Sequence, residues 1–140
     1  MAKLEQVEGI GKKYAGQLRK AGVRSTKSLL EKGATTKGRD EIARAAGIGG
    51  KLILEWVNHV DLFRIKGVGE EYSDLLEEAG VDTVVELAQR NAANLHEAIL
   101  ETNAKKKLVR RPPSKKMVKD WVANAKKLPR KVYYLSLIHI

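Results

Sequence analysis

The sequence contains no cysteine, so it has neither a disulfide framework nor thiolate chemistry, as is usual in a reducing compartment. It also lacks any apolar run that approaches membrane-spanning length, and no N-terminal apolar stretch resembles a signal peptide. We therefore expect a soluble, cytoplasmic protein without a membrane partner.

Stretches that alternate apolar and polar residues are missing too, which argues against strands and predicts an all-α fold. The three histidines, His59, His96 and His139, lie far apart without ligand-like spacing, so we expect no metal site. No residues form an activating arrangement around a nucleophile. We accordingly expect no enzymatic activity and no cofactor.

What the sequence does contain is an excess of positive charge. Lys and Arg outnumber Asp and Glu by 27 − 17 = 10, and the isoelectric point is about 9.8. A chain of 140 residues can form one domain or two very small ones. The charge favours an acidic partner such as a nucleic acid.

A glycine turn near the N-terminus organises the chain. In Val7–Tyr14 an apolar-spaced segment runs into Gly9-Ile10-Gly11, and apolar residues then recur at helical spacing until Gly22. The glycines allow a tight turn, and Ile10 can point into a core. Such a turn leaves the first N–H groups of the next helix free to bind a phosphate, beside Lys12 and Lys13.

The same pattern recurs 58 residues later, and residues 7–30 align without a gap on residues 65–88. The identities fall on the turn, the buried face and the end of the helix, as expected for a duplicated structural unit. The identical pairs are Gly9/Gly67, Gly11/Gly69, Tyr14/Tyr72, Leu18/Leu76, Ala21/Ala79, Gly22/Gly80, Val23/Val81 and Leu29/Leu87.

A second glycine turn, Gly47-Ile48-Gly49, precedes Lys51 and another helix with a wide apolar face. Matching Trp121 to Trp56 places Pro112-Pro113-Ser114 at the equivalent position of the second repeat. The glycine turn is therefore lost there, although Ser114 can serve as a helix N-cap. Both tryptophans lie on apolar helix faces, and we predict that they are buried.

These observations predict two units, 1–62 and 63–128, with about eight to ten short helices in total. Each unit has two helix-turn-helix elements joined by helical connectors, at 26–32 and 37–46 in the first and at 83–89 and 94–105 in the second. Residues 129–140 form a tail. Its last six residues, 135–140, resemble the translation of a sequencing adapter, the alternative being a short apolar tail, and we exclude them from functional reasoning.

The glycine turns and the helices around them resemble the double helix-hairpin-helix (SAM-like) domain of DNA repair and recombination proteins. The segment 18–30 is also similar to the C-terminal domain of the RNA polymerase alpha subunit. The chain to about residue 130 resembles a domain-of-unknown-function family of duplicated units, numbered four-three-three-two. The first resemblance implies that turn amides hold DNA phosphates without reading bases, at Gly9, Ile10, Gly11, Gly47, Ile48 and Gly49.

Charge distinguishes the two copies. Residues 7–30 carry six basic side chains against Glu8, a balance of +5, whereas residues 65–88 carry Lys66 against seven acids, a balance of −6. Glu70 and Glu71 replace Lys12 and Lys13 and would repel a phosphate, although they suit a helix N-terminus. The resemblance extends to Gly67-Val68-Gly69 in geometry alone, and we expect this third turn to pack rather than to bind.

Positive charge returns between residues 105 and 131, where Asp120 is the only acid. We interpret this region as facing a nucleic acid, with Lys115 and Lys116 at the start of a helix. Two function classes remain. The first is a sequence-independent DNA-binding module that uses Lys12, Lys13, Lys51, Lys115, Lys116 and the turn amides. The alternative is a protein-interaction or self-association scaffold that uses the acidic third turn region.

Overall fold

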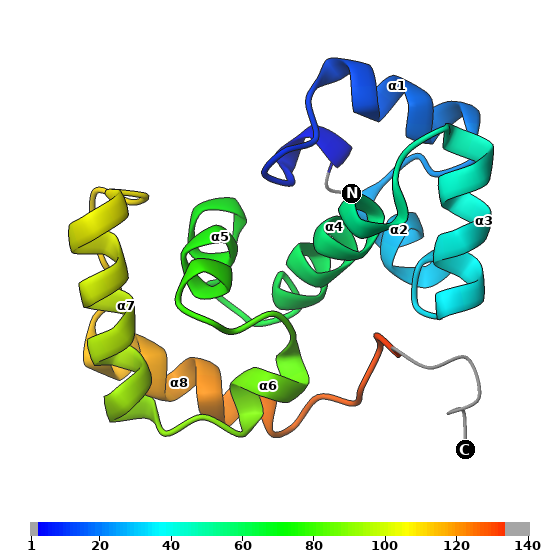
Figure 1. Cartoon of the computed structure of the whole chain (residues 1–140). Helices are drawn as coiled ribbons and strands as arrows, with labels where there is room; N and C mark the ends of the chain where they lie inside the picture. The colour runs from blue at the N-terminus through cyan, green and yellow to red at the C-terminus, as the bar shows by residue number, and fades with distance from the viewer. Residues whose placement is uncertain (1–2, 134–140) are drawn as a thin grey trace. The chain divides into compact units, whose positions relative to one another are not determined.

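The computed structural model describes residues 3–133, and every regular element in that range is helical. It contains one short 3-10 helix and eight α-helices (Figure 1), which confirms the predicted all-α fold and its number of helices. None of these helices is long and apolar enough to cross a membrane. The segment 135–140, interpreted above as an artefact, lies outside the described residues.

The chain divides into two compact units. Unit 1 contains the residues up to Asp61 and the segment that begins at Lys131, and unit 2 contains Leu62–Arg130. The sequence placed the boundaries after residues 62 and 128. It did not predict the return of residues 131–133 to unit 1, because this segment has no counterpart in the repeat.

Unit 1 is built from five helices that alternate with short turns. They are η1 (Leu4–Gln6), α1 (Lys12–Lys20), α2 (Thr26–Lys32), α3 (Thr36–Ala46) and α4 (Gly50–Leu62). Helix α3 packs on both α1 and α2. The apolar faces of the helices and the turn residues between them form one buried core, which includes Leu18, Leu29, Ile53 and Trp56.

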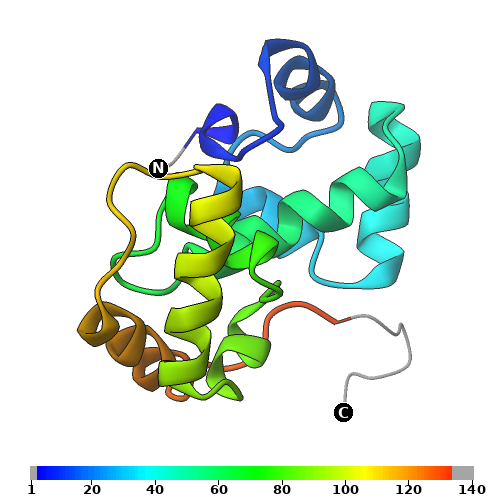
Figure 2. The same ribbon diagram turned by 60° about the vertical axis from the view of Figure 1, so that its left-hand side comes forward.

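Unit 2 repeats this order without the 3-10 helix. Its helices are α5 (Glu70–Glu78), α6 (Val84–Ala88), α7 (Ala92–Lys106) and α8 (Lys115–Ala125). Helix α7 packs on α5 and α8, and α6 packs on α8. A long loop joins α7 to α8 (Figure 2), where unit 1 has only a short turn between α3 and α4.

The repeat seen in the sequence is also a repeat of contacts. Tyr14 packs on Trp56 with ring centroids 5.0 Å apart, and Tyr72 packs on Trp121 at 5.2 Å, with similar tilts of 58° and 54°. The correspondence extends two residues beyond the aligned stretch. Lys32 Nζ donates to the carbonyl of Gly22 at 2.7 Å, and Arg90, 58 positions later, donates to the carbonyl of Gly80 at 3.4 Å.

Candidate functional site

The first glycine turn, residues 7–11, connects η1 to α1. Gly9 adopts φ +92°, in the left-handed region that glycine tolerates best, and Gly11 is the N-cap of α1. The N–H of Ile10 donates to the carbonyl of Val7 at 3.0 Å, which closes the turn, and the Ile10 side chain is buried as predicted. A side chain at Gly9 would also meet the indole nitrogen of Trp56 at 3.1 Å.

The second glycine turn, residues 47–49, connects α3 to α4. Gly47 ends α3 with φ +70°, and the N–H groups of Gly47 and Ile48 both donate to the carbonyl of Ala43. Helix α4 begins directly after Gly49, so the predicted turn geometry is confirmed at both pairs of glycines. Gln17 of α1 donates to the carbonyl of Ala46 at 3.0 Å, which places α1 beside this turn.

The N-termini of seven α-helices, all except α4, fall into two groups. Five helices begin at a polar N-cap whose side chain accepts a backbone N–H, namely α2, α3, α6, α7 and α8 with Ser25, Thr35, Thr83, Asn91 and Ser114. Helices α1 and α5 begin instead at Gly11 and Gly69, which have no side chain to accept a hydrogen bond.

The backbone N–H groups of residues 11–14 have no acceptor within residues 3–133, because the first bonded N–H of α1 is that of Ala15. In the second turn the N–H groups of residues 49–51 are likewise open, since Ile48 and Leu52 are the bonded neighbours on either side. Open N–H groups at the positive end of a helix dipole are hydrogen-bond donors suited to an anion.

Exposed lysines flank these open amides. Lys12 and Lys13 lie in the first turn of α1 and Lys51 lies in the first turn of α4, all solvent-exposed and without an ion pair in the described part of the chain. Arg19 differs from these lysines, because its guanidinium forms an ion pair with Glu5 at 2.9 Å. A backbone hydrogen bond and then Arg19 hold the pKa of Glu5 below its ordinary value.

The third glycine turn, residues 65–69, repeats the backbone of the first. Gly67 has φ +89°, Gly69 is the N-cap of α5, and the N–H of Val68 donates to the carbonyl of Ile65 at 3.0 Å. Exposed Glu70 and Glu71 occupy the first turn of α5. Lys66 is the one cation within residues 65–71, so this stretch of the backbone carries more negative than positive charge.

The connection between α7 and α8 differs from the glycine turns. Lys107 ends α7 at φ +50°, in the conformation that Gly47 has in unit 1, and residues 108–114 follow before α8. Ser114 accepts the N–H of Met117 at 3.1 Å, which confirms the predicted N-cap. Lys115 and Lys116 are exposed in the first turn of α8, and Pro113 is buried as Ile48 is.

Sequence reasoning overlooked the groove that this loop forms in unit 2. Lys107, Arg110 and Arg111 line it with residues of α5. The signal available in the sequence was the length of the segment between the end of the α7 pattern and Ser114, which is longer than the second glycine turn.

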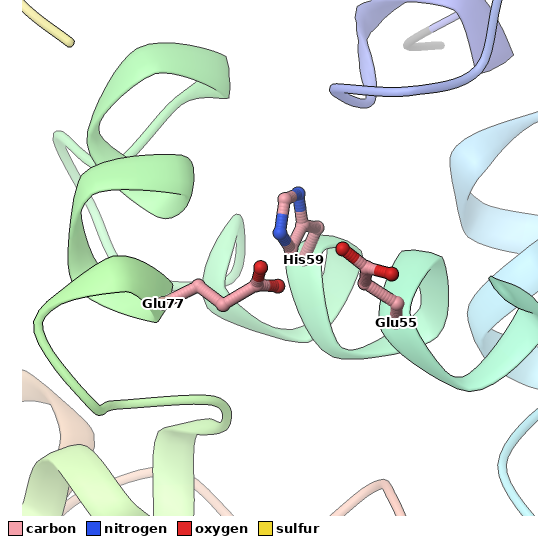
Figure 3. Close-up of side chains that lie close together, drawn as sticks. All are labelled: Glu55, His59 and Glu77. Atoms are coloured by element: carbon pink, nitrogen blue, oxygen red, sulfur yellow. The ribbon is translucent and has the colours of Figure 1, made fainter. Parts of the chain in front are cut away.

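The two tryptophans are buried, with exposed fractions of 1% for Trp56 and 3% for Trp121, which confirms that prediction. Glu55 and His59 project from successive turns of α4 in unit 1, whereas Glu77, also drawn in Figure 3, belongs to α5 of unit 2. Within the described residues of unit 1 no third donor joins Glu55 and His59. Two ligands are fewer than a zinc site normally requires.

Fold and site together define a class of all-helical proteins with two repeated units, each carrying a glycine turn beneath which a tyrosine and a tryptophan pack. The family model described as "Domain of unknown function (DUF4332)" matches residues 8–128, and the chain belongs to this family. No curated protein and no solved structure gives a significant match.

Proposed function

We propose that this protein is a non-enzymatic, sequence-independent DNA-binding module. The first and second glycine turns hold backbone phosphates of a duplex through their open amides, and Lys12, Lys13 and Lys51 add charge. The observation that carries the proposal is the pairing of acceptor-free N–H groups with exposed lysines at the starts of α1 and α4. The resemblance of these turns to helix-hairpin-helix domains supports it.

Physical arguments favour a nucleic-acid backbone over other anions. Two donor sites on one unit, whose helix α1 contacts the end of α3 through Gln17, suit a polymer of regularly spaced phosphates better than a single small anion. The net charge of +10 adds an attraction that does not depend on base sequence. Amides and lysines at a phosphate position the duplex without reading bases.

The lysine contribution is tested by Lys12→Glu with Lys13→Glu. Glutamates suit the first turn of a helix, and unit 2 has them at the same positions, so the variant should fold normally. Binding should weaken alike for all duplex sequences, and the salt slope should shrink by about one unit for each lost phosphate contact. The matched control is Lys27→Glu with Lys37→Glu, an equal charge change at exposed positions of the same unit.

The amide contribution is tested separately by Gly11→Asp. Open space surrounds the position of a Cβ at Gly11, and its φ of −85° suits any residue. An aspartate N-cap stabilises α1 but places a carboxylate where the phosphate would bind. The expected result is unchanged or higher stability with loss of duplex binding, measured by fluorescence anisotropy.

If the wild type retains no DNA or RNA even at about 50 mM salt, where phosphate contacts are strongest, the proposal fails. The protein-interaction scaffold would then take its place. The feature that favours the scaffold is the acidic face of unit 2, where Glu78 already pairs with Lys106 at 2.9 Å.

A further inference from the structure

An open groove of about 820 Å³ lies in unit 2 between the start of α5 and the loop that follows α7. Its walls combine cationic, aromatic and apolar side chains. The lining residues are Glu71, Tyr72, Lys107, Leu108, Val109, Arg110 and Arg111. This volume lies within the range of pockets that hold a small ligand or one segment of a polymer.

The backbone of the loop is fixed on both sides of the groove. The Tyr72 hydroxyl of α5 donates to the carbonyl of Arg111 at 2.9 Å. On the other side, the Asn103 side chain of α7 accepts the N–H of Val109 at 3.0 Å and donates to the Val109 carbonyl at 3.1 Å. The loop therefore presents its cations from a defined backbone, which lowers the entropic cost of binding.

The charge of the groove reverses the conclusion drawn from the repeat. Three cations, Lys107, Arg110 and Arg111, face one carboxylate, Glu71, which gives 3 − 1 = +2. In the sequence, Glu70 and Glu71 replace the lysines of the first turn, and we expected this region only to pack. In the structure, cations from a loop more than 35 positions further along the chain are brought to the same helix start.

Unit 1 has no equivalent of this arrangement, because three residues, 47–49, separate α3 from α4. The loop of unit 2 is longer, and both arginines lie within it. The loop that replaces the second glycine turn in unit 2 therefore also supplies the cations of the groove.

We propose that this groove is an additional phosphate-binding site for a nucleic-acid strand, formed by Lys107, Arg110 and Arg111. Arginine binds phosphate oxygens through two parallel N–H donors, whereas lysine contributes a point charge. Tyr72 and Leu108 form a wall against which a sugar or base can lie. The inference rests on the proposed function, since it takes the same ligand, but it uses different residues in the other unit.

The experiment maps backbone amide NMR shifts of the full chain during titration with a short DNA duplex and, separately, with a short single-stranded oligothymidylate. The expected result is a set of shifts at residues 107–111 and Tyr72 in addition to those at residues 11–13 and 49–51. A variant with Lys107→Gly, Arg110→Gln and Arg111→Gln should lose the groove shifts. Glycine at position 107 tolerates its positive φ, so the end of α7 is preserved.

The matched control is the variant with Lys20→Gln, Lys27→Gln and Lys37→Gln, which removes the same charge at exposed positions. The groove variant should reduce the salt slope by about one unit for each lost contact, beyond the control. Glu71→Gln should strengthen binding, because it removes the one opposing carboxylate of the groove.

The outcomes separate the two proposals. Shifts at the first and second turns without shifts at the groove would leave the proposed function intact and overturn this inference. Groove shifts alone would support the inference and remove the role of the turns. An absence of shifts at both places would overturn both. If the groove variant and its control lose the same amount of DNA affinity and salt slope, the effect is one of general charge and the inference is overturned. This comparison does not depend on the NMR shifts.

Discussion

At the scale of single residues, the glycine turns are explained by what lies beneath them as well as by backbone conformation. The indole nitrogen of Trp56 lies 3.1 Å from the position of a Cβ on Gly9, and that of Trp121 lies 3.4 Å from the same position on Gly67. A Cβ at Gly9 would require the Trp56 indole to shift by a few tenths of an ångström, whereas a Cβ at Gly67 would just contact the Trp121 indole. Each tryptophan thus supports the turn that its unit presents to solvent.

We predict that Trp56→Ala lowers the free energy of unfolding by about 3–5 kcal/mol, because the cavity it leaves cannot be filled by Tyr14 alone. Trp121→Ala should cost a similar amount in unit 2, where Tyr72 is the packing partner. Urea denaturation followed by circular dichroism measures both. A loss below about 1 kcal/mol would show that the ring contributes little packing and would reopen a role in base stacking.

At the scale of elements, the stability of short helices depends on how their ends are capped and on how closely neighbouring helices pack. Helices α2 and α3 meet where the end of one faces the start of the other. A Cβ on Gly38 would lie 2.0 Å from the carbonyl oxygen of Lys32, which is a backbone atom that cannot rotate away. Gly38 is therefore required by packing, although it lies in a helix, where glycine is otherwise unfavourable.

Gly38→Ala should destabilise unit 1 by about 1–3 kcal/mol, since α2 and α3 must separate to admit one methyl group. The matched control is Gly16→Ala in α1, where nothing lies within 4 Å of the added Cβ. That substitution should stabilise the protein by about 0.5–1 kcal/mol through helix propensity alone. Opposite shifts in the thermal midpoint are the expected result, and a neutral Gly38→Ala would contradict the packing described.

At the scale of the whole molecule, the chain leaves unit 1 after α4 and returns to it at Lys131. Val132 is 2% exposed, and the N–H of Tyr133 donates to the carbonyl of Ala34 at 2.7 Å. Arg39, itself 6% exposed, donates to the carbonyl of Tyr133 at 2.6 Å and to that of Gly33 at 2.9 Å. A buried guanidinium thus joins the last described segment to the α2–α3 connection.

Unit 2 has a different kind of residue at the position equivalent to Arg39. Counting from the N-caps of α3 and α7, Leu95 corresponds to Arg39, and it is completely buried in an apolar core. Arg39 in unit 1 is therefore specific to the returning segment and is not a general feature of the repeat.

We predict that a chain ending at Arg130 is less stable in unit 1 than a chain ending at Tyr133, by about 3 kcal/mol or more. The shorter chain leaves the buried guanidinium of Arg39 without the Tyr133 carbonyl as an acceptor. It also exposes the apolar surface of unit 1 that Val132 covers. Both chains would carry Trp121→Phe so that Trp56 fluorescence reports on unit 1. Identical urea midpoints would show that residues 131–133 do not stabilise unit 1.

Much of this organisation follows from the sequence alone. Apolar spacing, glycine positions and N-cap residues act over a few positions, so they determined the helices, the turns at Gly9 and Gly47, and the buried tryptophans. The 58-residue repeat determined that the units share one architecture. Open amides beside Lys12 and Lys13 followed as well, because a glycine N-cap has no side chain to accept them.

Only the tertiary structure decided which distant residues meet. The groove forms because a loop cation such as Arg110 lies at the start of α5. The alignment of the two repeats places only acidic residues such as Glu71 at this helix start. The role of Arg39 depends on a segment 94 residues away. Charge and packing act between residues that are close in space, whereas the glycine turns and the repeat are recognised from residues close together in the chain. The sequence therefore predicted the turns but not the groove or the returning segment.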